Sequence, residues 1–319
     1  MARHLTVVVR RVHQLTPDVT RYDLADPDDW PLPPFRAGAH VDVHLPNGLV
    51  RPFSLCSDPA AKTVWSIAVR HEPAGRGGSA FMQSGVQEGM TLSLSLPRNH
   101  FPLAQNVARH VFLAAGIGVT PFMAMIAALT GSGADFHLHM AARDEAHTPF
   151  HDEIAALIAQ GRATLHLSGG GSSRRMPVAA IVDTERRSPG AHLYACGPER
   201  FLADFLTATV AMPTECVHLE RFNAPAAATA VEGAPFDVEL ARSGRTVTVA
   251  PGQTILGAVR AIGVEVEASC EGGVCGACRT GVLAGEPDHR DFVMGPKDRE
   301  QYMMICVGGA KTPRLVLDL

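Results

Sequence analysis

The sequence lacks any long apolar segment. No apolar run reaches the ~18 residues that a membrane-spanning helix needs. The first residues, Met1 to Arg11, have no apolar core of the kind that marks a secretory signal peptide. These two absences predict a protein with no membrane association and a cytoplasmic location.

An excess of charge of one sign is also missing. The 28 Lys and Arg residues are balanced by 32 Asp and Glu residues, for a formal net charge of −4. Binding to nucleic acids or to anionic membrane surfaces depends on an excess of basic side chains, so nucleic acid is not an expected partner. With 319 residues, 46% of them hydrophobic, the chain is long enough to form two or three domains with their own cores.

Cysteine is scarce, and its spacing is uneven. Seven cysteines in a chain of this length are too few for a disulfide framework. Cys270, Cys275 and Cys278 form a C-x4-C-x2-C array, and Cys306 stands later in the chain. This is the spacing of plant-type 2Fe–2S ligation. A structural zinc site is the alternative, although zinc ribbons usually present two C-x2-C pairs. The remaining three, Cys56, Cys196 and Cys216, are expected to be buried small hydrophobes.

The first hundred residues have a different pattern from the middle of the chain. Short β-rich runs separated by Pro, Gly and Asp predict an antiparallel barrel; they include Leu5–Arg10, His40–Leu45, Val64–Val69 and Met90–Ser95. After Arg109, apolar strands alternate with helical segments, which favours a parallel sheet covered by helices. In this region, Thr148 and Pro149 predict an N-cap followed by Pro at the first helical position.

A low-complexity stretch rich in Ala, residues 224–234, is interpreted as a linker. Beyond it, two short runs around 241–244 predict a hairpin, and a helical run over Ile255–Ile262 precedes the cysteine loop. The expected domains are therefore residues 1–104, 105–223 and 235–319.

The loop Cys270-Glu-Gly-Gly-Val-Cys275-Gly-Ala-Cys278 resembles the cluster loop of the plant-type ferredoxins. With a reductase-like region ahead of it, nearly the whole chain resembles the phthalate dioxygenase reductase family. The resemblance implies an FMN-binding barrel, an α/β NADH-binding domain and an α+β ferredoxin domain of β-grasp type. It also implies a Rieske-type oxygenase as the partner.

Two segments of the barrel region resemble flavin motifs of the ferredoxin reductase superfamily. In Arg51-Pro-Phe53-Ser54, the resemblance implies that Arg51 neutralises the flavin phosphate, that Phe53 packs at the isoalloxazine ring and that Ser54 hydrogen-bonds near N5. A second segment implies a phosphate site at a helix start, and it contains Gly77, Gly78 and Ser79. A glycine-rich surface turn is the alternative for the second segment.

Two glycine-containing turns predict the nicotinamide dinucleotide site. Ala115-Gly116-Ile-Gly118-Val-Thr120-Pro comes after an apolar strand and opens a helix, as a pyrophosphate site requires, although it departs from G-x-G-x-x-G at the last position. Cys196-Gly197-Pro198 supplies the companion turn expected beside the nicotinamide. In similar proteins an E-x-F triplet passes the flavin, which points to Glu220 and Phe222; an ordinary surface Glu and core Phe are equally compatible.

The choice between related cofactors stays open in the sequence. FMN is preferred to FAD only because the domain order resembles the phthalate-type reductases. That resemblance also implies NADH. However, no acidic residue comes after the strand Ala163–Leu167 to bond a ribose 2′-hydroxyl, and Arg174 and Arg175 stand where they can meet the 2′-phosphate of NADPH. A solvated basic loop is the alternative for these two arginines.

The three cofactors together determine the expected activity. A nicotinamide gives two electrons as a hydride, a 2Fe–2S cluster accepts one, and a flavin stands between them. We therefore expect an NAD(P)H-dependent flavin iron–sulfur reductase, acting as a monomer on a protein acceptor. A stand-alone flavin or ferric reductase and a non-catalytic redox carrier or sensor are the alternatives.

Overall fold

The computed structural model describes residues 4–169, 175–223 and 234–319, so most of the expected linker and Arg174 lie outside the described residues. The chain folds as two compact units that divide between residues 220 and 221. No helix in the described ranges combines the length and the apolar character needed to cross a membrane.

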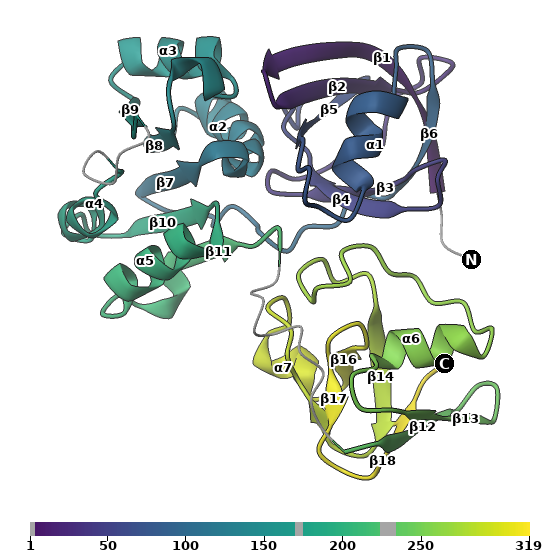
Figure 1. Cartoon of the computed structure of the whole chain (residues 1–319). Helices are drawn as coiled ribbons and strands as arrows, with labels where there is room; N and C mark the ends of the chain where they lie inside the picture. The colour runs from purple at the N-terminus through teal and green to yellow at the C-terminus, as the bar shows by residue number, and fades with distance from the viewer. Residues whose placement is uncertain (1–3, 170–174, 224–233) are drawn as a thin grey trace. The chain divides into compact units, whose positions relative to one another are not determined.

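The first layer of the N-terminal unit is a six-stranded antiparallel sheet in the order β4-β3-β6-β1-β2-β5 (Figure 1). Its strands are β1 (His4–Thr16), β2 (Val19–Ala25), β3 (His40–His44), β4 (Val50–Ser54), β5 (Val64–Arg70) and β6 (Thr91–Ser95). A bridge between Leu55 and Ile67 joins the two end strands and closes the sheet into a barrel. Alternating buried and accessible side chains along β1 and β6 explain why these segments are strands with one core face. Helix α1 (Gly78–Gly85) connects β5 to β6.

The second layer is a parallel sheet in the order β11-β10-β7-β8-β9. Its strands are β7 (Arg109–Ala115), β8 (Phe136–Ala142), β9 (Ala163–Leu167), β10 (Ala191–Cys196) and β11 (Val217–Glu220). The central strands are almost continuously apolar, as strands covered on both faces must be.

Helices cover both faces of the parallel sheet. They are α2 (Thr120–Ser132), α3 (His151–Ala159), α4 (Val178–Glu185) and α5 (Glu199–Thr209), with short 3-10 turns η1 (Gly116–Val119), η2 (Glu145–His147) and η4 (Thr214–Cys216). Val111 and Leu113 of β7 pack with α4 and α5. On the opposite face, Phe112 packs against Phe122 of α2, with ring centroids 5.0 Å apart.

The predicted N-cap of α3 is wrong. The helix begins at His151 rather than at Pro149, and its N-cap is Phe150, whose backbone is left-handed with φ 59°. The Thr148 hydroxyl instead donates to the carbonyl oxygen of Asp144 at 2.9 Å. Thr148 therefore closes the preceding η2 turn. The helix starts only after the left-handed residue Phe150, which changes the direction of the backbone.

The C-terminal unit is a five-stranded sheet that packs on one helix. Its order is β13-β12-β18-β14-β16, with β12 and β18 parallel and the other pairs antiparallel. The elements are β12 (Phe236–Leu240), β13 (Arg245–Val249), α6 (Ile255–Ala261), β14 (Arg279–Ala284), β15 (Pro287–Asp288), α7 (Pro296–Arg299), β16 (Tyr302–Met304), β17 (Gly309–Ala310) and β18 (Arg314–Leu317). Ile255, Leu256 and Val259 of α6 share one core with β12 and β18. The three predicted fold classes are thus confirmed.

Candidate functional site

Arg51 and the start of α1 form an anion site on the barrel. The Arg51 guanidinium donates to the carbonyl oxygen of Arg76 at 2.8 Å, which holds it against the turn that opens α1. A β-carbon on Gly78 would stand 2.5 Å from Cγ of Arg51, so glycine is what lets the arginine lie there. Gly77, with φ 79°, precedes the helix and leaves its first amides open. Amides at a helix start and a guanidinium together suit a phosphate group.

Ser79 has a different local role. Its hydroxyl accepts a hydrogen bond from the backbone amide of Glu72 at 3.1 Å, which ties the loop after β5 to the start of α1. The sequence places Ser79 among the phosphate ligands, and the structure brings it to the first turn of the same helix. Its side chain therefore shapes the loop as well as the site.

Ser54 and Glu220 meet where β4 and β11 end. The Ser54 hydroxyl donates to Oε2 of Glu220 at 3.4 Å, although the two residues are 166 positions apart in the chain. Ser54 is buried, and burial raises the pKa of the Glu220 carboxyl to about 8, against a smaller opposing effect of the hydrogen bond from Ser54. Burial therefore favours the protonated, neutral form of Glu220. Phe53, next to Ser54, is partly exposed, and Phe222 falls in the C-terminal unit.

The two glycine turns lie at the point where the strand order of the parallel sheet reverses. The chain leaves β7 into η1, and the neighbouring strand β10 ends at Cys196. A β-carbon on Gly118 would stand 2.2 Å from the carbonyl oxygen of Cys196, whereas Gly116, with φ 56°, faces open space. Gly197 likewise has no room, because its β-carbon would lie 2.9 Å from Cβ of Ala115. Dinucleotides bind outside the carboxyl ends of parallel strands at such a switch point.

Thr120 and Cys196 are buried beneath the two glycine turns. Thr120 is 2% exposed, and its hydroxyl donates to the carbonyl oxygen of Ile117 at 3.0 Å, which closes the η1 turn. Cys196 is fully buried, and burial raises the pKa of its thiol well above the usual value. A buried neutral thiol is not a nucleophile. Pro198 then supplies the extended residue from which α5 starts.

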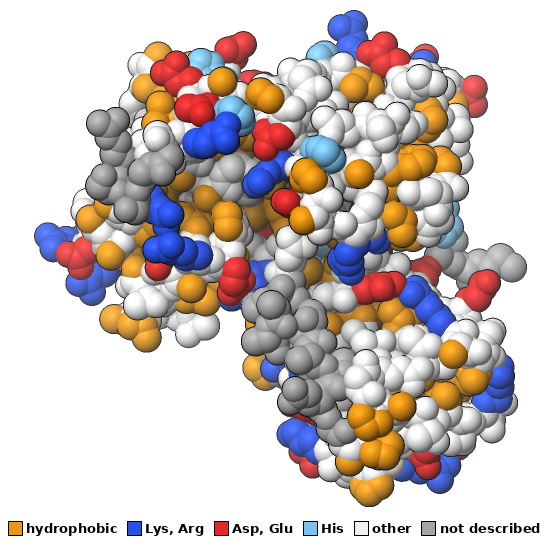
Figure 2. Space-filling model, viewed as in Figure 1, with side chains coloured by type: hydrophobic (Ala, Val, Ile, Leu, Met, Phe, Trp, Pro, Cys, Tyr) orange, Lys and Arg blue, Asp and Glu red, His pale blue; other side chains and the backbone are white. Residues whose placement is uncertain are grey.

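A pocket of about 450 Å³ opens over this edge, between the barrel and the parallel sheet of the N-terminal unit. Gly116, Ile117 and Pro198 form part of its wall. Its other charged and imidazole side chains were missed in the sequence: Asp18, Arg70, Arg143, His147, His166, Arg200 and Asp204, with Arg175 as the one residue already singled out. Figure 2 shows several Lys and Arg side chains, in blue, gathered on the viewed face of this unit. A signal existed for Arg143 alone, because it comes directly after an apolar strand.

The four cysteines of the array come together in the C-terminal unit. All four are buried. The four thiols affect one another's protonation. The neighbouring thiols of Cys275 and Cys306 lower the pKa of the Cys270 thiol far below its usual value, and the thiol of Cys306 lowers the pKa of Cys278. In the described part of the chain, no three His, Cys, Asp or Glu side chains are arranged to hold a single metal ion.

The cysteine loop aims backbone amides at sulfur. The amides of Gly272 and Val274 donate to Sγ of Cys270 at 3.4 and 3.5 Å, and the amide of Cys270 donates to Sγ of Cys275 at 3.4 Å. Gly273, with φ 71°, has no room for a β-carbon, which would lie 2.7 Å from Val307. Amide donors to sulfur stabilise thiolates and tune the potential of an iron–sulfur cluster. The donor set therefore fits a 2Fe–2S cluster.

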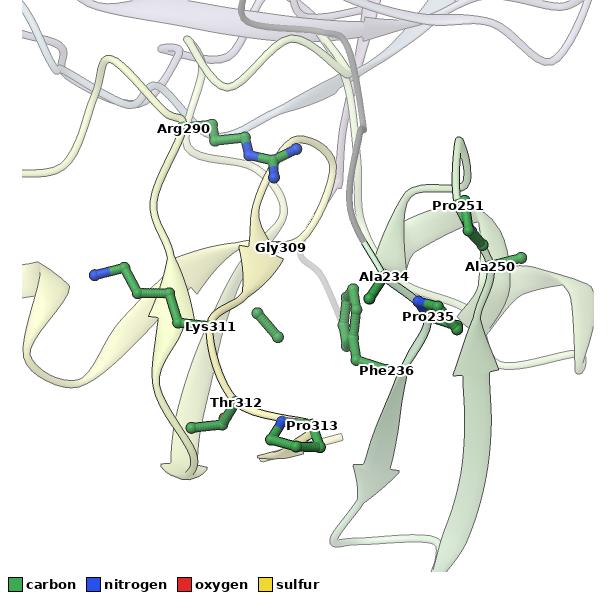
Figure 3. A pocket seen from close by; sticks show the side chains of 11 residues that line it. Ala234, Pro235, Phe236, Ala250, Pro251, Arg290, Gly309, Lys311, Thr312 and Pro313 are labelled. Atoms are coloured by element: carbon green, nitrogen blue, oxygen red, sulfur yellow. The ribbon is translucent and has the colours of Figure 1, made fainter.

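The C-terminal unit also contains a second, smaller cavity. It has a volume of about 240 Å³ and lies beside β12, β17 and the start of β18. Figure 3 shows the ring of Phe236 on one wall, with Arg290 and Lys311 on the other side. The cavity is lined by none of the array cysteines.

The comparisons with known proteins agree with this architecture. Residues 238–310 match the family described as 2Fe-2S iron-sulfur cluster binding domain. The chain is 42% identical to the phenoxybenzoate dioxygenase subunit beta of Ectopseudomonas oleovorans, over 100% of this chain and 99% of that protein. It is 35% identical to the phthalate dioxygenase reductase of Burkholderia cepacia, over 99% of this chain and 97% of the relative.

Solved structures also match almost the whole chain. A self-sufficient type IV cytochrome P450 monooxygenase superposes with a TM-score of 0.86 at 35% identity, over 99% of this chain and 41% of the larger one. Phthalate dioxygenase reductase, described as a modular structure for electron transfer from pyridine nucleotides to [2Fe-2S], superposes with a TM-score of 0.76 at 35% identity, over 99% and 98% of the two chains. With this identity over nearly the full length of both chains, the protein belongs to the phthalate dioxygenase reductase family.

Proposed function

We propose that this chain is the reductase component of a Rieske-type oxygenase system and passes electrons from NAD(P)H through FMN and a 2Fe–2S cluster to the oxygenase. The observation that carries the proposal is the set of four buried cysteines, with backbone amides that donate to the sulfur atoms of Cys270 and Cys275. The domain limits that we propose remain 1–104 for flavin, 105–223 for the nucleotide and 235–319 for the cluster.

The geometry of each site indicates the proposed ligand residues. Arg51 and the first amides of α1, at Gly78 and Ser79, would hold the flavin phosphate. The Gly116 turn would take the pyrophosphate, while the turn from Cys196 to Pro198 would position the nicotinamide. When bound, the flavin accepts a hydride and releases electrons singly, and the cluster accepts them one at a time.

Glu220 and Ser54 would act at the reacting end of the flavin. Because the pKa of Glu220 is about 8, the side chain carries a proton at neutral pH and stays uncharged beside a hydride donor. Its hydrogen bond with Ser54 fixes the hydroxyl at the end of β4. We propose that this neutral pair orients the ring without adding charge to the site.

The proposed acceptor is a separate oxygenase protein. Relatives named as dioxygenase subunits and reductases cover the full chain, which supports an oxygenase partner. The match to a cytochrome P450 monooxygenase favours a haem oxygenase as the second candidate acceptor. We propose that the chain is a monomer, since a transient electron donor needs only a small docking surface. None of the seven cysteines forms a disulfide in the described structure, which supports a cytoplasmic location.

The test is an anaerobic titration of purified protein with NADH and with NADPH, monitored by absorbance and electron paramagnetic resonance. Iron, zinc and flavin are measured on the same sample. The proposal expects FMN, two iron atoms per chain and a rhombic signal that appears when the nucleotide is added. Zinc without that signal would refute the cluster assignment, and an oxidised flavin spectrum after nucleotide addition would indicate a non-catalytic carrier.

Assays with a small-molecule acceptor and with an acceptor protein distinguish an oxygenase reductase from a stand-alone flavin or ferric reductase. A stand-alone flavin or ferric reductase would reduce small acceptors equally well in the wild type and in Cys306→Ser, which removes a proposed cluster ligand. An oxygenase reductase would keep flavin reduction in this variant but lose electron transfer to the acceptor protein. Assays with a purified Rieske oxygenase and with a P450 haem domain would then distinguish the two acceptor classes.

A further inference from the structure

The part of the large pocket that lies after β8 and β9 is lined by basic side chains and by no carboxylate. When a dinucleotide crosses the carboxyl edge of a parallel sheet with its pyrophosphate at the first glycine turn, its adenosine half lies over the outer strands. Here those are β8 and β9, and the pocket residues that come after them are Arg143, His147, Ser168 and Arg175. Among the pocket-lining residues at this end, none is a carboxylate.

Two acids, Asp144 and Glu145, follow Arg143, and neither lines the pocket. The carboxylate of Asp144 is engaged by its own loop. Oδ1 accepts hydrogen bonds from the backbone amide of His147 at 3.0 Å and from its ring at 2.6 Å. Oδ2 accepts from Nε of Arg143 at 3.1 Å. The carboxylate therefore caps η2 and does not line the pocket, whereas the side chains of Arg143 and His147 do.

The two acids that do line the pocket stand elsewhere. Asp18 comes from the barrel and pairs with Arg70 at 3.3 Å, and Asp204 comes from α5, on the side of the nicotinamide turn. A site that reads the 2′-hydroxyl of NADH needs a carboxylate at the adenosine end. The pocket residue that follows β9 is Ser168, and Asp144 and Glu145, which follow β8, do not line the pocket.

Besides Arg143, the adenosine end of the pocket has a second arginine, Arg175. It is exposed and it lines the pocket. A planar guanidinium donates paired, charge-assisted hydrogen bonds to phosphate oxygens. Arg143 lies on the same wall. Arg174 lies outside the described residues and is not part of the site.

We infer that this end of the pocket selects the 2′-phosphate of NADPH, with Arg175 and Arg143 as its specificity-determining residues. The inference rests on the proposed function and narrows its NAD(P)H donor to the phosphorylated form. A serine in place of an acid removes the repulsion that a carboxylate would exert on the phosphate, and the arginines add the attraction.

The first measurement compares 2′,5′-ADP with 5′-AMP by isothermal titration calorimetry on the full chain. The two probes differ only in the 2′-phosphate. We expect 2′,5′-ADP to bind about tenfold tighter or more, because charge-assisted hydrogen bonds each contribute that much. Arg175→Gln should remove most of the difference. Arg187→Gln, which changes an exposed arginine paired with Asp183 and outside the pocket, is the matched control and should leave it intact.

The second measurement is the rate of flavin reduction by each nucleotide. The wild type should have the higher kcat/KM with NADPH. Arg175→Gln should lower kcat/KM about tenfold for NADPH and much less for NADH, and Ser168→Asp should reverse the preference. Equal binding of the two probes, or faster reduction by NADH, would overturn the inference and leave the proposed function standing. If neither nucleotide reduces the flavin, the proposed function fails, and probe binding still decides the inference.

Discussion

The carbonyl oxygen of Cys196 lies 2.2 Å from the point where a β-carbon on residue 118 would stand. The two residues belong to the turns after β7 and β10, which are neighbouring parallel strands. Gly118 is therefore required for the two strand ends to approach, while Gly116, which faces open space, is free to contact a ligand. The two glycines of one motif serve different purposes.

Gly118→Ala should separate these strand ends. Because the clash is with backbone, which cannot move aside like a flexible side chain, we expect a loss of about 3 kcal/mol or more in stability of the N-terminal unit. Thermal denaturation measures this, and NAD(P)H binding should weaken in parallel. Gly131→Ala is the control: it lies within α2 with nothing within 4 Å of its β-carbon, and it should be neutral or slightly stabilising. Equal effects of both substitutions would contradict the argument.

The predictions from the sequence were most successful where the residues of a site lie close together in one short motif. Three of the four array cysteines lie in one loop, and Arg51 and the glycines of α1 are marked by short motifs, so the structure brings each group together as expected. The resemblance pointed Ser54 and Glu220 separately to the flavin, and only the tertiary fold reveals that Ser54 hydrogen-bonds to Glu220. Thr148 shows why a capping motif alone can mislead. Its hydroxyl does bond to the backbone, but it closes the η2 turn before α3 and does not cap α3. Of the basic side chains in the pocket wall, Arg175 was singled out from the sequence. The others stand alone in the sequence and form no motif, and the position of Arg143 directly after a strand was not used.

The titration of Glu220 should be visible in the pH dependence of stability. Burial raises its pKa to about 8 from a usual value of 4.5. Between these values the folded state holds a proton that the unfolded state has released, so stability is greatest at the acid end of the range and falls as pH rises toward 8. Glu220→Gln removes the titrating group. The melting temperature of the variant relative to the wild type should therefore rise from about pH 5 to about pH 8.

An exposed glutamate of the same unit provides the control for this experiment. Glu215 lies in η4, just before β11, and Glu215→Gln should keep the same offset from the wild type at both pH values. An offset for Glu220→Gln that is constant with pH would show that the carboxyl is ionised in the folded protein. The neutral pair proposed for the flavin site would then be wrong.

His110 should make the N-terminal unit sensitive to acid. Burial, with a smaller effect of His192, lowers the pKa of His110 to about 4, so the ring is neutral in the fold. The unfolded state takes up a proton below about pH 6.5, and stability is lost as pH falls from there toward 4, by up to about 1.4 kcal/mol per pH unit. His110→Phe keeps a ring beside Phe112 and should flatten the fall in melting temperature from pH 7 to 5. His151→Gln, an exposed residue, should leave the slope unchanged.

Gly273 should control retention of the cluster. Gly273 and Gly263 both have a left-handed backbone, with φ of 71° and 77°, so alanine at either position bears a similar conformational cost of about 1 kcal/mol. Only at Gly273 would the new β-carbon also meet neighbours, Val307 at 2.7 Å and Asp291 at 3.2 Å, in the loop that supplies amides to Cys270. Gly273→Ala should therefore lower the iron content and the rhombic signal of the purified protein at unchanged flavin content, whereas Gly263→Ala should retain both. Full iron occupancy in Gly273→Ala would mean that the loop adjusts without moving its amides away from sulfur.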